Sequence, residues 1–442
     1  MDIVPHTVVV TKDFVTSRSG LVAIATLIKR LGLTDWVRQY FPKPGSNRGY
    51  PAHAYVNTFI LMLHEGAKCL EDSRHLRDDE ALKILFANPH IPSACALGDW
   101  LRRLGKENGI EAISQVNRQL LSASLGDVKQ VTLDIDATFI ASKKKAAEYS
   151  YTKQKGYMPI VGHIMETGQV IYTEMRDGNV PPSKENLEVM HACERLLPEG
   201  VKLGAVRMDA AGYQAAILND CLARNIAFAI RAKMDKSLKA TITNIPEEQW
   251  KPIKDNNNNV ISESSTTRIT HSMEKSTEAF ELIIERTPLS TTTNDEQDAE
   301  DALASGDFMY RAIAVSGNPS MSDKGWIAWY NQRGEHSENR LKELKTDFAA
   351  SSLPCSDFAA NALYFWLCAL AYNLFALLRR HYFPAHLRRC RAKTVRCRLY
   401  AVAGKVVRHA RGIVLKLSGQ CSQLLKTLLD AVSSAPPQCD TS

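Results

Sequence analysis

The sequence has no pair of cysteines spaced as Cys-x-x-Cys, although ten cysteines are scattered over its 442 residues. Disulfide-stapled domains and zinc ribbons need cysteines at short, regular spacings, so neither class is expected. The nearest grouping of sulfur and imidazole ligands is His381, His386, Cys390 and Cys397. Its spacing fits no standard zinc motif, so we do not expect a structural zinc site.

Acidic side chains are missing from a long C-terminal stretch. Residues 358–429 contain thirteen Lys and Arg and neither Asp nor Glu, whereas the whole chain has 55 basic and 48 acidic residues. A long run of one sign repels itself unless a polyanion neutralises it, and nucleic acid is the natural polyanion. Residues 233–325 have the opposite bias, with sixteen acidic and ten basic side chains.

The first residues, MDIVPHTVVV, lack the basic and apolar regions of a secretory signal. One stretch, residues 359–378, is long and apolar enough for a membrane span. Asn361 and Asn373 interrupt it and a charged segment precedes it, so we expect a helix buried in a soluble core. The protein is therefore expected in the cytoplasm, without a membrane partner.

The composition is that of a soluble globular protein, with 45% hydrophobic and 23% charged residues. The length leaves room for two or three domains. Apolar residues recur at three- and four-residue spacing over 21–33 and 57–70. This period predicts that the N-terminal region, residues 1–125, is mainly helical.

Residues 78–105 contain two short predicted helices around an Asn-Pro turn, with Ser93 as candidate N-cap of the second. Such an order resembles a helix-turn-helix DNA reader, in which Arg102 and Arg103 beside Trp100 would contact DNA. A plain helical hairpin gives the same pattern and is an open alternative.

The pattern changes near residue 127. VTLDIDATFIAS (131–142) alternates apolar and polar side chains, which is the period of a strand. Strand-like stretches follow over 156–168 and 169–179, and helices then alternate with strands up to residue 233. Three strands followed by alternating helices and strands predict an α/β domain with a mixed sheet.

Residues 234–325 interrupt this α/β domain, whose first part covers 126–233. Polar and acidic runs here separate the strand-like FELIIERT and YRAIAVS, which predicts a β-rich insertion with flexible loops. The α/β domain resumes over 326–378, where YNQRGEHSENRLKELK (330–345) is expected to form a helix. A basic, helical C-terminal region is expected over 379–442.

Three carboxylates are candidates for a common site. In TLDID, Asp134 and Asp136 point to the polar face of the strand, where acids are usually just solvated. Asp209 ends a strand in AVRMDAAGY, the place where α/β sheets assemble sites, although it could equally cap the next helix. Glu338 belongs to the charged segment 330–345, where it could equally form a surface pair with Lys342.

Three carboxylates brought together would repel one another unless cations were bound. Oxygen ligands of this kind suit Mg²⁺ or Mn²⁺, and two such ions about 3.5–4 Å apart can promote in-line displacement at phosphorus. Beside a polycationic surface, the implied substrate is a nucleic-acid phosphodiester. This inference requires that the three segments converge.

The chain resembles the DDE transposases of bacterial insertion sequences, in the group with a Tyr–Arg–Glu–Lys signature. Their first acid lies in Asp-x-Thr on the first strand, matched by Asp136-Ala137-Thr138, and their second ends the fourth strand, matched by Asp209. Tyr330, Arg333, Glu338 and Lys345 match the signature, except that four residues instead of three separate Arg333 from Glu338. Glu335, which keeps the six-residue gap to Lys342, is the alternative third acid.

This resemblance implies a ribonuclease-H-like α/β core with a β-rich insertion, flanked by helical N- and C-terminal regions. It implies catalytic and metal-ligating roles for Asp136, Asp209 and Glu338, with two Mg²⁺ or Mn²⁺ ions. The partners would be the terminal inverted repeats and target DNA, bound by a homodimer in the bacterial cytosol. DNA-binding roles are implied for Tyr330, Arg333, Lys345 and Trp250, although Trp250 could equally be a core residue.

The implied function is cleavage of DNA at the ends of an insertion sequence and joining of the 3′-OH ends to target DNA. Two other functions remain open. A ribonuclease-H-like nuclease would hydrolyse DNA without joining it, and a transposase-derived regulator would bind DNA without cleaving it.

Overall fold

The computed structural model describes residues 8–45, 49–86, 90–126, 128–254, 260–289, 302–334, 338–410 and 412–434. The chain forms two compact units, the first from residues up to 126 together with those from 343 onward, the second from residues 127–342. The chain passes between the units after residue 126 and again within helix α13 (Asn339–Asp347), between Lys342 and Glu343. The domain bounds expected from the sequence stay a prediction.

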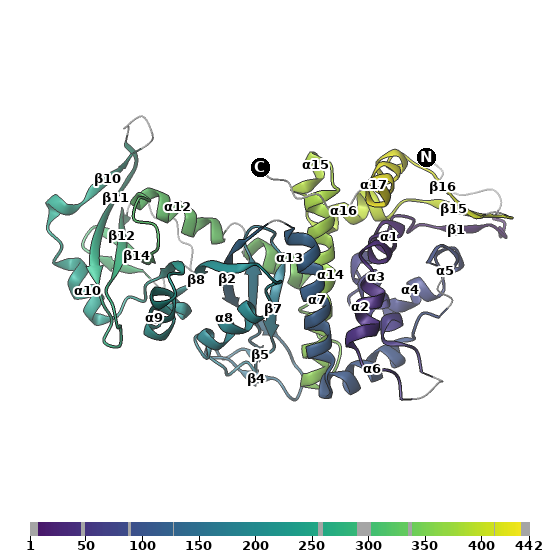
Figure 1. The fold of residues 1–442 in the computed structure, drawn as a ribbon, viewed down its shortest axis with the longest axis horizontal. Coiled ribbons are helices and arrows are strands. Elements are labelled where there is room, and N and C mark those ends of the chain that lie inside the picture. The colour runs from purple at the N-terminus through teal and green to yellow at the C-terminus, as the bar shows by residue number, and fades with distance from the viewer. Residues whose placement is uncertain are drawn as a thin grey trace. The chain divides into compact units, whose positions relative to one another are not determined.

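The first unit is mainly helical (Figure 1). Its helices are α1 (Leu21–Leu31), α2 (Leu33–Tyr40), α3 (Ala52–Glu65), α4 (Arg74–Arg77), α5 (Glu80–Phe86), α6 (Ala94–Lys106), α7 (Gly109–Leu125), α14 (Phe358–His381), α15 (Ala385–Arg388), α16 (Ala392–Val395) and α17 (Ser422–Ser434). Ser93 caps α6 as predicted, because its hydroxyl accepts a hydrogen bond from the amide of Ala96 at 3.3 Å.

Helix α14 forms the centre of this unit, packed against α3, α6 and α7. It is long and apolar enough to cross a membrane by length and composition, yet every residue from Ala360 to Leu378 is buried. Its polar interruptions are satisfied internally: Asn361 exchanges hydrogen bonds with the backbone of Cys355, and Asn373 donates to Asn117 at 2.6 Å. The prediction of a buried core helix is confirmed.

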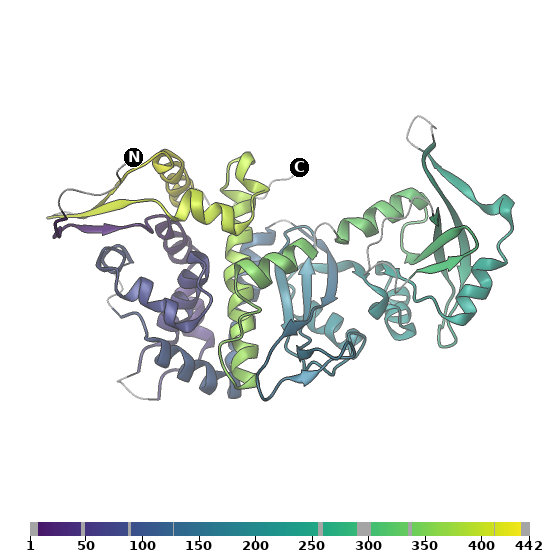
Figure 2. The same cartoon turned by 180° about the vertical axis from the view of Figure 1, so that it is seen from behind.

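A three-stranded antiparallel sheet also belongs to the first unit (Figure 2), with the order β1 (Phe14–Thr16), β15 (Gly404–His409) and β16 (Gly412–Leu417). The C-terminal region that was expected to be helical therefore contains two strands besides its helices. Val406 packs against Ala81 and Ile84 of α5, while Lys405 and Lys416 lie opposite each other on the other face. The alternation of Val and Ile with basic residues is typical of strands.

The second unit is built on a ten-stranded mixed sheet with the order β10-β11-β12-β14-β9-β8-β2-β6-β7, and β13 pairs with β14. Its strands are β2 (Gln130–Ala137), β6 (Ile160–Ile164), β7 (Val170–Glu174), β8 (Lys202–Met208), β9 (Ala227–Arg231), β10 (Lys251–Lys254), β11 (Val260–His271), β12 (Phe280–Pro288), β13 (Leu303–Ser305) and β14 (Phe308–Ser316). A small sheet joins β3 (Ile140–Ala141), β5 (Lys155–Tyr157) and β4 (Glu148–Tyr149). The predicted α/β architecture with a mixed sheet is confirmed.

The strand directions follow the predicted order of elements. Strands β2, β8 and β9 are parallel, β6 pairs antiparallel with β2, and β7 pairs antiparallel with β6. Helices α8 (Asn186–Arg195) and α9 (Ala215–Ala223) form the connections that parallel strands require. The expected β-rich insertion, which also contains α10 (Lys236–Thr243), extends this same sheet, because β14 pairs antiparallel with β9.

The two faces of the sheet are covered by different helices. Helix α8 packs against β6 and β7, and a Cβ on Gly162 would come within 2.5 Å of the Cys193 sulfur, so this glycine permits the close approach. Helix α12 (Asp323–Arg333) packs on the opposite face, where Trp326 and Tyr330 join a buried cluster with residues of β9, β12 and β14.

The single regular helix expected over 330–345 is wrong. Helix α12 ends at Arg333 and α13 begins at Asn339. Gly334 and Glu338 have the wider hydrogen bonding of a π-helix, and residues 335–337 between them lie outside the described residues. Glu338 lies directly before the first residue of α13.

Candidate active site

The parallel strands β2 and β8 bring two of the predicted acids to one edge of the sheet. Asp134 lies beside Arg207, and Ile135 lies beside Met208. The next positions along the two strands are Asp136 and Asp209, on the same face as Asp134 and Arg207. Because neighbouring strands lie about 4.8 Å apart, the sheet makes the carboxylates of Asp136 and Asp209 neighbours.

Asp134 is bound within the sheet and has no free oxygen toward the site. Its Oδ1 and Oδ2 accept hydrogen bonds from Nε and Nη2 of Arg207 at 2.7 and 2.8 Å, and both residues are fully buried. Nη1 of Arg207 donates to the carbonyl of Trp329 at 2.5 Å. The pair therefore joins β2, β8 and α12, and the carboxylate of Asp134 is already neutralised.

Asp136 is paired with Arg333, the last residue of α12. Nη2 of Arg333 donates to Oδ1 of Asp136, and both side chains are about nine-tenths buried. Burial by itself would lower the pKa of the Arg333 guanidinium. The charge of Asp136, with smaller effects from Tyr330 and Asp209, outweighs burial and raises that pKa above its ordinary value.

Tyr330 lies one turn before Arg333 on α12, and its ring centre is 6.0 Å from the Arg333 guanidinium carbon. The residue is 8% exposed, and burial raises the pKa of its hydroxyl. Tyr330 and Arg333, two residues of the predicted signature, are thus brought together with Asp136 and Asp209.

Asp209 combines the two roles that the sequence left open. Its Oδ1 accepts a hydrogen bond from the amide of Ala211 at 3.1 Å, so it caps the short helical turn Ala210–Gly212. The residue is also partly exposed at the end of β8. One carboxylate oxygen can cap while the other faces the site.

The third predicted acid does not join the first two in this structure. Glu338 is exposed, and its Oε1 would be 3.9 Å from a Cβ built on Gly334. Glu335, the alternative, lies outside the described residues. Among the described residues, no group of three or more His, Cys, Asp or Glu side chains could hold a metal ion.

The oxygen donors present are therefore only a partial fit to a divalent metal. Asp136 and Asp209 are hard oxygen ligands of the type that Mg²⁺ and Mn²⁺ take. However, the guanidinium of Arg333 neutralises Asp136, and no third carboxylate completes the set within the described residues. The three-carboxylate metal site expected from the sequence is not assembled in this conformation.

The structure adds two buried residues that the sequence analysis missed. Arg231 follows Ile230, which lies beside Met208, so Arg231 extends the row of Asp136 and Asp209 onto β9. Its Nε and Nη2 have no hydrogen-bond partner in the described structure. His163 lies opposite Asp134 on β6, and burial lowers the pKa of its ring to about 3. Strand register is the signal that would have identified both.

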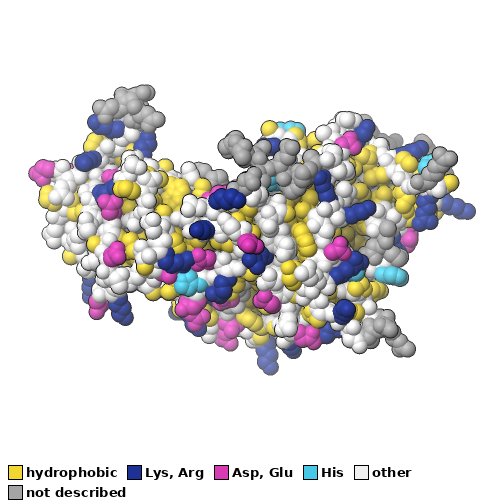
Figure 3. Space-filling view, viewed as in Figure 1, with side chains coloured by type: hydrophobic (Ala, Val, Ile, Leu, Met, Phe, Trp, Pro, Cys, Tyr) yellow, Lys and Arg dark blue, Asp and Glu magenta, His cyan; other side chains and the backbone are white. Residues whose placement is uncertain are grey.

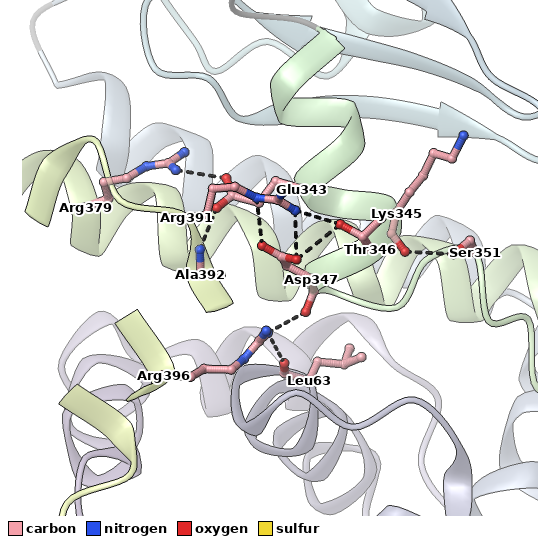
Figure 4. A network of polar contacts seen from close by, with 10 residues as sticks. All are labelled: Leu63, Glu343, Lys345, Thr346, Asp347, Ser351, Arg379, Arg391, Ala392 and Arg396. Atoms are coloured by element: carbon pink, nitrogen blue, oxygen red, sulfur yellow. Dashed lines mark hydrogen bonds and ion pairs between the residues drawn. The ribbon is translucent and has the colours of Figure 1, made fainter. Parts of the chain in front are cut away.

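Lys345, the last signature residue, lies in the C-terminal half of α13, which belongs to the first unit. The side chain is partly buried, and burial lowers the pKa of its ammonium. Figure 4 shows it directed away from a neighbouring network of acids and arginines. Lys345 stays a predicted DNA contact.

The neighbouring network neutralises part of the basic C-terminal stretch (Figure 4). Glu343 pairs with Arg379 at 2.8 Å, and Asp347 pairs with Arg391 at 2.9 Å. Arg396 donates to the backbone carbonyls of Leu63 and Asp347. These three arginines therefore stabilise the first unit, and the inference that the whole stretch needs a polyanion was too broad. On the face drawn in Figure 3, Lys and Arg are scattered among Asp and Glu.

The remaining predicted DNA contacts lie in two places, at Trp250 just before β10 and on α6. Trp250 is 9% exposed, and the Arg286 guanidinium carbon lies 4.4 Å from its ring centre, so this tryptophan is packed in the described structure. Arg102 and Arg103 are exposed on α6, where Arg102 pairs with Asp99 at 2.6 Å. Trp100 of the same helix is buried and stacks on Tyr55, with 5.0 Å between the ring centres.

Comparison with known proteins assigns the chain to a family. A family model described as transposase DDE domain group 1 matches residues 7–436. Among solved structures, the chain is similar to the piggyBac transposase in a synaptic complex with hairpin DNA, determined by cryo-electron microscopy. The identity is 8% and the TM-score 0.43, over 96% of this chain and 83% of that chain. No curated protein matches the chain. Because the family model covers nearly the whole sequence, the chain belongs to the transposase DDE domain group 1 family.

Proposed function

We propose that this transposase cleaves DNA at the ends of an insertion sequence and joins the freed 3′-OH ends to target DNA. The observation that carries the proposal is the placement of Asp136 and Asp209 side by side at the ends of parallel strands, beneath Arg333 and Tyr330 of α12. Carboxylates next to a buried guanidinium suit a phosphodiester that must be held and displaced.

The strand order supports a ribonuclease-H-like core. Strands β7, β6 and β2 form an antiparallel meander, and β8 and β9 follow in parallel with β2 through α8 and α9. Such an order is what the resemblance to DDE transposases implies for the catalytic domain. In such a core, Asp136 lies on the first strand and Asp209 follows the fourth, the positions that the resemblance implies for the first two acids.

Each residue has a proposed role. The guanidinium of Arg333 presents a planar fork to a phosphate, and Lys345 adds a point charge. Asp136, Asp209 and Glu338 are the proposed catalytic residues and the proposed ligands of two Mg²⁺ or Mn²⁺ ions. Because these three do not form one group in the described structure, the metal site would require a rearrangement. Trp250, Arg102 and Arg103 are proposed DNA contacts, and a cytoplasmic homodimer is the proposed assembly on DNA.

Strand transfer is the decisive experiment. Labelled duplexes from the DNA flanking the coding sequence would be incubated with the full chain, a supercoiled plasmid and Mg²⁺. Covalent joining of the label to plasmid DNA is the expected result. Cleavage without joining would support the nuclease, and end binding without cleavage would support the regulator.

Substitution of the acids tests the site itself. Asp136→Ala, Asp209→Ala and Glu338→Ala should each abolish nicking while leaving end binding largely intact, as measured by gel shift. If Asp209→Ala still cleaved, the proposed site would be wrong.

A further inference from the structure

We infer that Arg333 acts as an internal cation that occupies Asp136 until a DNA phosphate draws it away, so that metal binding and DNA binding are coupled. The inference rests on the proposed function, because it concerns the same carboxylates. It accounts for the difference between the expected three-carboxylate metal site and the arrangement in the structure.

The contact itself is the first support. Arg333 and Asp136 are joined by a charged hydrogen bond in a site where both side chains are about nine-tenths buried. A divalent ion on either oxygen of the Asp136 carboxylate would lie close to this guanidinium, and the two cations would repel each other strongly in a poorly hydrated site. Metal binding at Asp136 is therefore disfavoured while Arg333 is in place.

The unused donor of Arg333 is the second support. Its Nε is buried and has no hydrogen-bond partner within the described structure. A buried guanidinium donor without a partner is costly. A phosphate can take two parallel hydrogen bonds from one guanidinium, so an incoming phosphodiester offers Arg333 more than the single contact with Asp136.

The third support is the charge balance among the side chains that line the site on neighbouring strands and on α12, here called the row. Asp134 and Arg207 neutralise each other. The remaining row contains Asp136 and Asp209 as two negative charges and Arg231 and Arg333 as two positive charges, so it is already neutral. A divalent ion alone would leave this largely buried row with two uncompensated positive charges. A phosphodiester that enters with the ion and pairs with Arg333 reduces this excess to a single positive charge.

The coupling has a thermodynamic consequence. If DNA raises the affinity for the metal, the metal must raise the affinity for DNA by the same factor. Couplings of this kind are typically about 5- to 150-fold. Removing the charge of Arg333 should release the metal site from its dependence on DNA.

Manganese binding to the DNA-free full chain tests the inference, with the free Mn²⁺ signal in electron paramagnetic resonance as readout. Arg333→Gln should bind Mn²⁺ about fivefold or more tightly than the wild type. Arg333→Lys keeps the positive charge and should bind as weakly as the wild type. Arg333→Gln/Asp136→Asn should lose the gained site, and the melting temperature of each variant checks its folding.

A second measurement needs no substitution of Arg333. Affinity for a fluorescein-labelled duplex from the flanking DNA would be measured by anisotropy in Ca²⁺ and in EDTA. The wild type should bind about fivefold or more tightly in Ca²⁺, and Asp136→Asn should show no such gain.

Two outcomes would overturn the inference: Mn²⁺ binding by the DNA-free wild type as tight as by Arg333→Gln, or a gained site that survives Asp136→Asn. Absence of strand-transfer products, with the Mn²⁺ results as expected, would instead refute only the proposed function.

Discussion

Asp134 and Arg207 form a fully buried ion pair, joined by two hydrogen bonds of 2.7 and 2.8 Å. The pair lies between β2 and β8, two positions before Asp136 on β2. The two aspartates are only two residues apart on β2, yet their surroundings differ. Asp134 is held by an arginine of the neighbouring strand, whereas Asp136 is held by an arginine of the covering helix. We therefore assign Asp134 to the stability of the sheet and Asp136 to the site.

The first prediction concerns stability. Asp134→Ala should lower the free energy of unfolding by about 3–5 kcal/mol, because it leaves the Arg207 guanidinium buried without its counter-charge. Urea denaturation followed by circular dichroism measures this loss. The double variant Asp134→Leu/Arg207→Met should recover much of it, and equal losses in both variants would contradict the assignment.

The second prediction separates activity from stability at Asp209. Asp209→Asn should abolish nicking, because the amide cannot replace the carboxylate charge in the site. The free energy of unfolding should change by less than about 1 kcal/mol, because Asn caps a helical turn as well as Asp does. Nicking assays and urea melts on one preparation test both parts. Retained nicking would remove Asp209 from the site.

The third prediction decides which glutamate is the third acid. Glu338→Gln should abolish nicking, and Glu335→Gln should leave it within about threefold of the wild type, a change of less than about 1 kcal/mol in barrier height. The two variants are matched in chemistry and differ by three positions in one segment. The reverse result would assign Glu335, which keeps the six-residue gap to Lys342.

The fourth prediction follows from His64, which is fully buried between Tyr400 and the carbonyl of Ala371. Burial, with a contribution from Arg396, lowers the pKa of its ring to about 3. The unfolded chain therefore binds the proton more readily, and stability is lost as the pH falls below about 6.5. Between pH 7 and 5 this one residue should cost about 2 kcal/mol.

His64→Gln tests that value, because glutamine keeps a polar side chain that does not titrate. Urea melts at pH 7 and pH 5 should show a pH-dependent loss smaller by about 2 kcal/mol than in the wild type. An unchanged loss would mean that His64 is protonated in the folded chain.

The fifth prediction concerns the exposed basic side chains of the β15–β16 hairpin. Lys405 and Lys416 lie directly opposite each other, a like-charge pair that disfavours the hairpin unless an anion is near. Asp13 reaches Lys405 at 2.8 Å, so one of the two charges is partly compensated. We expect DNA phosphates to interact with this pair.

The double variant Lys405→Gln/Lys416→Gln should weaken binding to duplex DNA of any sequence and reduce the salt slope of the binding constant by about 2. Lys236→Gln, an exposed lysine in the acidic segment 233–325, is the matched control and should leave both quantities unchanged. Equal effects of the two changes would argue against a DNA contact at the hairpin.

The sequence predicts most elements of the second unit because their periods are clear. The alternation in TLDID and the apolar strands around Asp209 follow from one face being buried. The same local patterns do not contain strand register, and register is what places Arg207 beside Asp134 and Arg231 beside Asp209. The distinction between a structural and a site aspartate therefore required the structure.

Other errors have particular causes. The basic side chains of GKVVRHARGIVLKL suggested a DNA-binding helical tail, whereas its alternating Val and Ile make it a hairpin. The carboxylates of Glu343 and Asp347 lie outside the acid-free stretch 358–429, so a count within that stretch could not show that they pair with Arg379 and Arg391. The end of α12 at Arg333 was missed because helical propensity does not reveal a change in helical hydrogen bonding.

The pairing of β14 with β9 has a consequence for any attempt to trim this protein. Four residue pairs, from Ile313 beside Arg231 to Ser316 beside Phe228, continue the sheet from the core into the β-rich segment. A chain shortened by removing residues 234–325 would expose the backbone of β9, the strand that ends in Arg231, as an open sheet edge. Such an edge recruits strands from other molecules, so the shortened chain should aggregate. The β-rich segment therefore covers the edge of the central sheet at β9.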